Sequence, residues 1–381
     1  MIWHILTGEY PPSCGGVGDY TSLVARGLAA AGDTVRVWTP AAEDGRDDRQ
    51  RTLPDRFGPL SRDVLGRAWL DDPGIVLVQY VPNAFGARGA NLPFCRWVRE
   101  QAHSGCDVRV MFHEPYFYYS LNRPWRNALA AVQRMMAAEL IKASRCIYMS
   151  SSNWVRYLSP YAALPDSLVL PIPSTIPERA DPRRETHFRA SIQGSVPAPV
   201  IGHFGTYGEH LAAELTRVLS PIVERHPDVR LAFIGKGSVE FLESLQSVMP
   251  AVAGRAWASG WLDRRNTAAA LRACDLLLQP YPDGVTTRRT SVMAGLQNGV
   301  ATVTTDGFLT ESVWREALPA ALAPAGDTQA MMAAISSLLG DAEARRTLAR
   351  RGRHIYRERF SIGRTIDALR ASVEMGAGCL V

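Results

Sequence analysis

Lysine is nearly absent from this sequence of 381 residues. Only Lys142 and Lys236 occur, so arginine supplies almost all of the positive charge, and the formal net charge is +5. Guanidinium groups bind carboxylates and phosphates through paired hydrogen bonds. A mild basic excess suits an anionic ligand, a nucleic acid or a membrane surface, and it does not decide among these partners.

Several motifs are absent as well. The six cysteines form no C-x-x-C pair and no histidine and cysteine spacing typical of zinc, so we expect neither a metal site nor a disulfide framework. The sequence has no run of about 18 apolar residues for a membrane span, and its start lacks the basic leader of a signal peptide. We therefore expect a cytoplasmic protein that needs no metal or other bound cofactor.

Apolar runs alternate with helical patterns along the chain, which predicts βαβ units and parallel sheets. Residues 18–32 have the apolar spacing of an amphipathic helix that ends at Gly32. This pattern predicts an α/β protein with two doubly wound, Rossmann-like domains. A first series of strands is predicted at residues 2–6, 34–39, 75–80, 108–113 and 146–151, and a second series at residues 199–205, 229–235, 255–260, 276–281 and 300–305.

The domain boundary is expected in residues 170–199, a segment rich in proline and charge. Its prolines oppose regular secondary structure, and its charges oppose burial. We place the first domain at residues 1–175, a linker at residues 176–198 and the second domain at residues 199–360. The basic helical stretch at residues 361–381 is a candidate for a helix that crosses back to the first domain.

Ligands of doubly wound domains bind beyond the carboxyl ends of the strands, where loops lead into helices. Four loops have this position. In the first, Gly15, Gly16 and Gly18 let amide groups converge on an anion, and Asp19 and Tyr20 begin the helix that follows. A glycine-rich turn without a ligand is the alternative, because the spacing is not the G-x-G-x-x-G dinucleotide fingerprint.

Two further loops place polar or flexible residues directly after a strand. His113 and Glu114 follow a strand of the first series, where a histidine can donate to a substrate hydroxyl or stabilise developing charge. A histidine bonded to nearby backbone is an equally good interpretation. Gly235, Lys236 and Gly237 form a tight turn that suits a base or a phosphate, or a plain connection between strand and helix.

The fourth loop, residues 281–289, places two arginines where a helix begins. A cation there opposes the helix dipole by roughly 0.3–1 kcal/mol. A bound polyanion reverses this effect, because guanidinium groups and helix amides then hold the same phosphates. We hypothesise that Arg288 and Arg289 bind a diphosphate; the alternative is that they contact a carboxylate or solvent. Asp283, Gly284, Thr286 and Thr287 complete the loop, and either threonine can cap the helix.

Together these segments resemble the family 4 retaining glycosyltransferases of the GT-B fold. The resemblance rests on "GGVGDYT", His113-Glu114, "VIGHFGTYG", "AFIGKGS", "LLLQPYPDG" with "MAGLQNGVATVTTDG", and "YRERFS", and it spans nearly the whole chain. It implies two domains facing across a cleft, the first binding mainly the acceptor and the second a nucleotide-sugar donor. It also implies transfer without an obligatory metal ion.

The resemblance implies roles for individual residues. It places Gly15 and Gly16 at the donor phosphates and sugar, His113 at the transferred sugar, and residues 235–237 near the base. Acceptor contacts are expected from Asp19, Tyr20 and Glu114. The remaining donor contacts are expected from Gly18, Gly205, Thr206, Tyr207, Asp283, Gly284, Thr286 and Thr287, with Arg288 and Arg289 on the leaving group.

Two features depart from the family pattern. Thr286 and Ala294 occupy the positions of the usual glutamate pair, which holds the donor sugar and the ribose in the family. The family's arginine and lysine after the first strand of the second domain are also absent, since that stretch offers only Thr206, Tyr207 and His210, so the arginines of the fourth loop are the candidate substitutes. This indicates a divergent subgroup, with front-face transfer in which the leaving diphosphate helps to deprotonate the acceptor.

Other functions are compatible with this fold. A nicotinamide-dependent oxidoreductase would show the dinucleotide fingerprint, which is missing. A sugar-nucleotide epimerase and a catalytically silent nucleotide-sugar-binding protein stay open. Residues 115–145 mix aromatic residues with arginine, as interfacial helices do, but we favour a core-packed helix with a solvated basic face over membrane contact. No nucleic-acid-binding module is recognisable.

Overall fold

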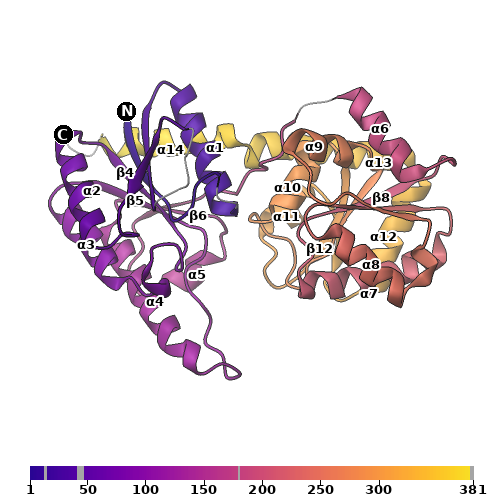
Figure 1. Ribbon diagram of the computed structural model, residues 1–381, viewed down its shortest axis with the longest axis horizontal. Coiled ribbons are helices and arrows are strands. Elements are labelled where there is room, and N and C mark those ends of the chain that lie inside the picture. The colour runs from indigo at the N-terminus through magenta and orange to yellow at the C-terminus, as the bar shows by residue number, and fades with distance from the viewer. Residues whose placement is uncertain (13–14, 41–46, 179–180, 378–381) are drawn as a thin grey trace. The chain divides into compact units, whose positions relative to one another are not determined.

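The computed structural model describes residues 1–12, 15–40, 47–178 and 181–377. The chain divides into two compact units, one formed by Met1–Pro171 with Ile362–Val381 and the other by Ile172–Ser361. Each unit has a central sheet with helices packed around it (Figure 1). All strand pairs are parallel, which confirms the predicted α/β class with two doubly wound, Rossmann-like domains.

The sheet of the first unit has seven strands in the order β3-β2-β1-β4-β5-β6-β7. Its central strands are buried on both faces, as a helix-covered parallel sheet requires. The sequence does not predict β3 and β7, which are short, partly exposed edge strands. The strands are β1 Ile2–Leu6, β2 Thr34–Pro40, β3 Gln50–Leu53, β4 Ile75–Tyr80, β5 Asp107–Phe112, β6 Cys146–Met149 and β7 Asp166–Val169.

The C-terminal helix α14 packs on α1 in the first unit. Gly27 of α1 makes this close approach feasible, because a Cβ at that position would lie 2.6 Å from Cγ1 of Ile366. Arg109 of β5 is buried and donates to Oγ of Ser372, at 2.8 Å. The helices of this unit are α1 Gly16–Ala30, α2 Pro59–Asp71, α3 Leu92–His103, α4 Trp125–Ala143, α5 Trp154–Leu158 and α14 Ile362–Ala377.

The sheet of the second unit has six strands in the order β10-β9-β8-β11-β12-β13. The strands are β8 Val200–Phe204, β9 Arg230–Ile234, β10 Ala256–Ala258, β11 Leu276–Gln279, β12 Ala301–Asp306 and β13 Ala321–Pro324. The helices are α6 Pro182–Gln193, α7 Glu209–Arg225, α8 Ser238–Val248, α9 Arg264–Arg272, α10 Thr290–Gln297, α11 Ser312–Ala317, α12 Thr328–Gly340 and α13 Ala342–Ile355. The sequence does not predict β13, another edge strand.

Residues 176–198, for which the sequence predicts a linker, belong to the compact second unit. They contain α6, which begins with an Asp181 side-chain cap and packs on α9. Arg189 of α6 forms an ion pair with Asp275 at 2.7 Å and donates to the carbonyl oxygen of Ala273. The charges of this segment therefore form contacts with the domain, which is why a charged, proline-rich sequence is folded here.

Four of the six cysteines lie in the described residues. Cys95, Cys106, Cys146 and Cys274 are free thiols, and Cys14 and Cys379 lie outside the described residues. Among the helices that the structure describes, none combines the length and apolar character needed to cross a membrane.

Each sheet contains one buried histidine that is held in its neutral form. In β1, Nε2 of His4 donates to the carbonyl oxygen of Asp72 at 2.9 Å, and Nε1 of Trp38 donates to Nδ1 at 3.2 Å. In β8, Nδ1 of His203 donates to the carbonyl oxygen of Leu278 at 2.8 Å. Burial lowers the pKa of both histidines to about 4. Both rings are therefore neutral in the folded protein near pH 7.

We predict that mild acid destabilises both units over the same range. An unfolded histidine has a pKa near 6.5, so below that pH the unfolded chain binds more protons than the folded chain. The stability contributed by the neutral rings is present above pH 6.5 and is lost as the pH falls towards 4. Urea unfolding between these pH values should show a falling midpoint, and His203→Gln should flatten that slope.

The control for this experiment is His210→Gln, which changes an exposed histidine of the same unit. His203→Gln also lowers stability at neutral pH, so the slope of the midpoint with pH is the relevant quantity. A slope unchanged from that of the wild type would show that protonation of His203 does not govern acid stability.

Candidate functional site

The candidate functional residues lie at the carboxyl ends of the parallel strands. Because all strands of a sheet run the same way, the loops that follow them meet at one edge. Every residue that the sequence assigns to a site lies in such a loop or within the first five residues of the helix after it.

The start of α1 is already occupied by a carboxylate of the chain. The amides of Val17 and Gly18 both donate to Oε1 of Glu9, at 3.0 Å. Gly15 leaves room for this side chain, because a Cβ there would lie 2.1 Å from Oε2 of Glu9, whereas a Cβ on Gly16 would meet nothing within 4 Å. The amide of Gly18, which the sequence assigns to the donor, therefore holds an internal anion together with that of Val17, while a Cβ on Gly16 would meet no described residue.

The side chains of His113 and Tyr20, which the sequence predicts as site residues, are in contact in the first unit. Nε2 of His113 donates to Oε1 of Gln79 at 2.7 Å, and both side chains are buried. The ring of Tyr20 meets the imidazole edge-on, with 5.0 Å between centroids. Burial raises the pKa of Tyr20, so its hydroxyl stays protonated. Asp19 is half-buried in the first turn of α1, and Glu114 is exposed.

A cavity of about 630 Å³ lies beside this glycine loop, at the carboxyl ends of β1, β2 and β4. Arg56 and Arg88 line it and are exposed, and within the described residues neither guanidinium forms an ion pair. Its only acidic lining residue in that part of the chain, Glu9, already binds the amides of α1. Among the described residues, the cavity therefore presents two arginines without an ion pair and one carboxylate that is already bonded. It is lined by Gly8, Glu9, Tyr10, Thr39, Pro40, Arg56, Asn83, Ala84, Gly86, Ala87 and Arg88.

The two arginines occupy strained backbone positions. The φ angles of Arg56 and Phe57 are 50° and 67°, and those of Ala87 and Arg88 are 47° and 52°. Left-handed backbone is costly for residues other than glycine and persists where the surrounding structure enforces it, often at binding sites. Phe57 is buried against Phe85, with ring centroids 4.8 Å apart, which anchors both loops in the core. The sequence contains no local signal for this pair of arginines.

The loops after β8 and β9 are in direct contact. A Cβ on Gly235 would lie 2.3 Å from the carbonyl oxygen of Gly205, and Gly235 has a φ of 115°. Gly237 is also left-handed, with a φ of 85°. Only glycine fits this approach of one loop to the other. The exposed side chains of the two loops are Thr206 and Lys236.

Tyr207, which the sequence assigns to the donor, packs inward. Its hydroxyl donates to the carbonyl oxygens of His203 and Ile234, at 3.1 and 3.3 Å. Its ring stacks on Phe241 with 5.0 Å between centroids. The polar group that could have contacted a ligand is thus bonded to the backbone of β8 and β9, and this side chain supports the sheet.

The loop between β11 and α10 is held against the residues after β12. A Cβ on Gly284 would lie 2.4 Å from the amide nitrogen of Gly307, and the carbonyl of Asp283 accepts from the amide of Leu309 at 2.9 Å. The amide and hydroxyl of Thr287 donate to the buried carboxylate of Glu311, at 2.6 and 2.7 Å. These contacts fix the path of the chain into α10.

The start of α10 differs from the sequence prediction. Neither Thr286 nor Thr287 is the N-cap: Arg289 is, no side chain caps the helix, and α10 begins at Thr290. The carbonyl of Thr286 instead accepts from the amide of Arg289 at 3.0 Å, and the hydroxyl of Thr287 is bonded to Glu311.

Arg289 places its guanidinium over the ring of Tyr281, with Cζ 4.3 Å from the centroid, and 3.9 Å from the carboxylate of Asp283. Its Nε is buried and donates to no group in the described part of the chain. The amides of residues 290–292 form no hydrogen bond among the described residues either. Arg288 precedes it and is half-buried. Several N–H donors are thus available to an anion at the positive end of a helix.

A hydrogen-bonded chain connects this site to the end of β8. Nε2 of Gln279 donates to the carbonyl oxygen of Phe204 at 3.1 Å, and the hydroxyl of Tyr281 donates to Oε1 of Gln279 at 3.3 Å. The same hydroxyl lies 2.7 Å from Oγ of Ser291 in α10. The sequence patterns do not predict a role for Gln279 or Tyr281. The sequence does contain one indication of this hydrogen-bonded chain: a glutamine ends an otherwise apolar strand, and a buried side-chain amide requires hydrogen-bond partners.

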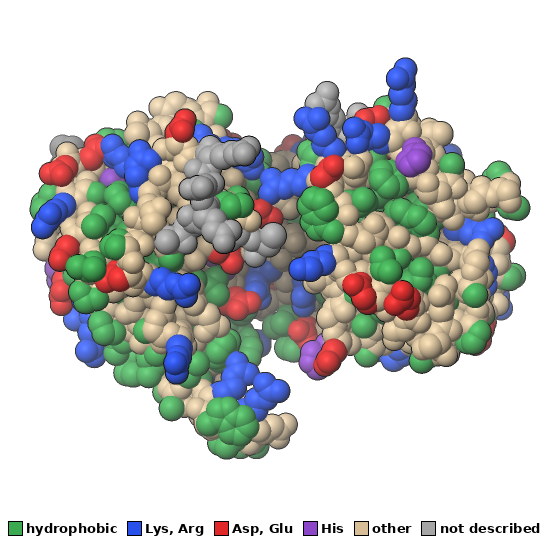
Figure 2. Space-filling model, in the orientation of Figure 1, with side chains coloured by type: hydrophobic (Ala, Val, Ile, Leu, Met, Phe, Trp, Pro, Cys, Tyr) green, Lys and Arg blue, Asp and Glu red, His purple; other side chains and the backbone are tan. Residues whose placement is uncertain are grey.

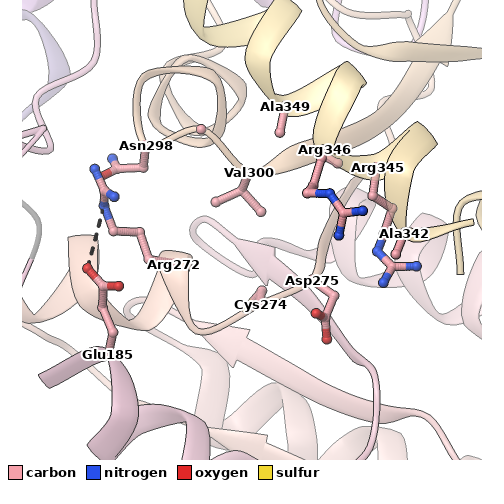
Figure 3. Close-up of a pocket in the computed structure, with 12 residues that line it drawn as sticks. Glu185, Arg272, Cys274, Asp275, Asn298, Val300, Ala342, Arg345, Arg346 and Ala349 are labelled. Atoms are coloured by element: carbon pink, nitrogen blue, oxygen red, sulfur yellow. Dashed lines mark hydrogen bonds and ion pairs between the residues drawn. The ribbon is translucent and has the colours of Figure 1, made fainter. Parts of the chain in front are cut away.

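Another pocket, of about 320 Å³, lies at the opposite, amino end of the second sheet (Figure 3). Arg272 lies 3.9 Å from the carboxylate of Glu185 and donates to Oδ1 of Asn298 at 3.2 Å. Arg345 donates to the last carbonyls of α12, and Asp275 accepts from the amide of Val200. Its charged groups are thus engaged within the protein, and its lining contains none of the site residues selected from the sequence.

Comparison with known proteins shows the fold of the chain and a family match within the second unit. Residues 198–341 match the family described as Glycosyl transferases group 1. No curated protein sequence matches the chain. These matched residues contain β8 to α12, and with them all the loops at the carboxyl edge of the second sheet.

Solved structures resemble the whole chain. Sucrose-phosphate synthase from Thermosynechococcus elongatus has a TM-score of 0.69 at 17% identity, covering 99% of this chain and 100% of that one. HepE from Anabaena, solved with UDP and glucose, has a TM-score of 0.71 at 12% identity and covers 98% and 100%. A glycosyltransferase from Rickettsia africae has a TM-score of 0.72 at 12% identity and covers 98% and 97%. The chain therefore has the GT-B fold, and its second unit contains the segment that matches the group 1 glycosyl transferases.

Proposed function

We propose that the protein transfers a sugar from a nucleotide-sugar donor to an acceptor hydroxyl, and that the second unit binds the donor. The proposal is carried by N–H donors at the start of α10 that have no partner among the described residues, namely Nε of Arg289 and the amides of residues 290–292. The family match over residues 198–341 and the complexes of HepE with UDP support a nucleotide as the ligand.

This arrangement suits stabilisation of a leaving diphosphate. When the bond between the sugar and the diphosphate breaks, negative charge grows on the departing oxygen. A guanidinium and the positive end of a helix stabilise that charge in the transition state more than in the bound donor. The arginine at residue 289 opposes the helix dipole in the free protein, and a bound diphosphate removes that repulsion.

We propose further that the sugar is transferred with retention and without a metal ion. Thr286 and Ala294 are both buried and bring no carboxylate nucleophile to α10. The leaving diphosphate would accept the proton of the acceptor hydroxyl as the new bond forms on the same face of the sugar. Arg288 and Arg289 supply positive charge that a metal ion would otherwise bring to the diphosphate.

A catalytically silent nucleotide-sugar-binding protein is the second candidate. The observation that favours it is the absence of both glutamates at residues 286 and 294. Release of nucleotide from the donor in the presence of an acceptor separates an enzyme from a binding protein.

We propose that the cavity of the first unit binds the acceptor, and that the acceptor carries an acidic group. Arg56 and Arg88 reach the cavity without an ion pair in the described residues, and guanidinium groups bind phosphate and carboxylate in the same way. Two of the structurally similar proteins, sucrose-phosphate synthase and trehalose-6-phosphate synthase, are named for sugar phosphates.

Replacement of Arg289 tests the donor site. Arg289→Ala should weaken binding of a nucleoside diphosphate about tenfold or more, because a hydrogen bond to a charged group contributes roughly 1.5–3 kcal/mol. Calorimetric titration would measure this with UDP, GDP, ADP or dTDP, whichever raises the melting temperature most. Turnover of the matching nucleotide sugar should fall with it, and EDTA should leave wild-type turnover unchanged.

Arg272→Ala is the matched control, because it removes an arginine of the same unit at the amino end of the sheet. Equal nucleotide affinity in the wild type and in Arg289→Ala would contradict the proposed donor site. Tight binding without turnover under any acceptor would favour the silent binding protein instead.

The acceptor proposal is tested separately with charged and uncharged sugars. The wild type should bind hexose phosphates or uronates more tightly than uncharged hexoses, and Arg56→Ser with Arg88→Ser should weaken that binding by about tenfold. Ligand-detected NMR measures the preference of the wild type and the loss of sugar binding in the double variant. The nucleotide affinity of the double variant should equal that of the wild type. Arg96→Ser, at an exposed position of α3, is the control. Equal binding of acidic and neutral sugars by the wild type would rule the proposal out.

A further inference from the structure

The loop at residues 114–124 and the start of α4 expose large apolar side chains at one place. Leu121 is 98% exposed and Trp125 is 72% exposed, and Tyr118 and Tyr119 are each 55% exposed. Figure 1 shows α4 extending beyond the other helices of the first unit. Figure 2 shows hydrophobic and basic side chains gathered at the end of this projection. Single exposed apolar residues are ordinary, but such a contiguous group indicates an interaction surface.

Polar side chains of α4, among them the buried Arg134, anchor this loop to the protein. Arg134 of α4 lies between the rings of Tyr116 and Tyr119, with its Cζ 4.0 and 3.9 Å from their centroids. It also donates to the carbonyl oxygen of Phe117 at 2.9 Å. These contacts hold the loop against α4. Leu121 and Trp125 are therefore exposed from an ordered segment.

All charged side chains of residues 115–138 are basic. No aspartate or glutamate occurs between Glu114 and Glu139, whereas Arg123, Arg126 and Arg134 do. Arg123 is exposed among the apolar residues, and Arg126 is half-buried. Aromatic rings favour the headgroup level of a bilayer, aliphatic side chains enter its acyl boundary, and arginine pairs with anionic lipid phosphates.

We propose that residues 118–126 form a docking surface that attaches the first unit reversibly to an anionic lipid bilayer. An acidic protein partner would match the arginines but gives no reason for a leucine with almost its entire side chain in water. A second copy of the chain would set this basic surface against itself. The buried face of α4 packs in the core as the sequence predicts, while its amino end provides the surface. The proposal does not depend on the proposed transferase activity.

Vesicle flotation with the full chain tests the proposal. The wild type should float with vesicles of equimolar phosphatidylglycerol and phosphatidylcholine and should remain at the bottom with phosphatidylcholine alone. Leu121→Ser with Trp125→Ser should reduce binding about tenfold or more, because the apolar contact with the bilayer is lost. Arg123→Glu should also reduce it, and added salt should weaken wild-type binding.

The matched control is Leu70→Ser with Trp261→Ser, which changes a leucine and a tryptophan that are 82% and 73% exposed outside this surface. It should float like the wild type, and melting temperatures should confirm that all variants fold. Failure of the wild type to float, or equal flotation of the Leu121 and Trp125 variant, would overturn the proposal. A wild-type dimer that this variant converts to a monomer, without vesicle binding, would assign the surface to self-association and would also overturn it.

Discussion

Parallel pairing of every strand is the constraint on which the chemistry of both units depends. It brings the ends of β1, β4 and β5 together in one unit, and those of β8, β9 and β11 in the other. Helices begin at the same edges, so the positive ends of their dipoles meet the loops that carry polar side chains. The two units differ in what lies at those helix starts, and that difference determines their proposed roles.

At α1, the carboxylate of Glu9 binds the free amides, and a glycine at residue 15 makes room for it. At α10, no carboxylate of the described residues binds the first amides, and Arg289 adds a positive charge, with Asp283 3.9 Å away. The first helix start is electrostatically satisfied, whereas the second gains stability from an added anion. This contrast is the physical reason to place the donor diphosphate on the second unit and the acceptor in the basic cavity of the first.

The sequence predicts the central strands and the edge where the sites lie, because buried parallel strands are continuous apolar runs followed by glycine or polar residues. It does not predict β3, β7 or β13, whose short, half-exposed sequences lack that run. It also misses contacts between distant segments. No local pattern shows that Glu9 folds back onto α1, that the hydroxyl of Tyr207 bonds to the backbone, or that Arg56 and Arg88 line one cavity.

The central claim is that the start of α10, and not the glycine loop of α1, holds the leaving diphosphate. A crystal structure of the protein with its preferred nucleoside diphosphate would test this claim most directly. We predict diphosphate oxygens within hydrogen-bonding distance of Nε of Arg289 and the amides of residues 290–292, with Glu9 still bound to α1. A diphosphate on the amides of Val17 and Gly18, with Glu9 displaced, would contradict it.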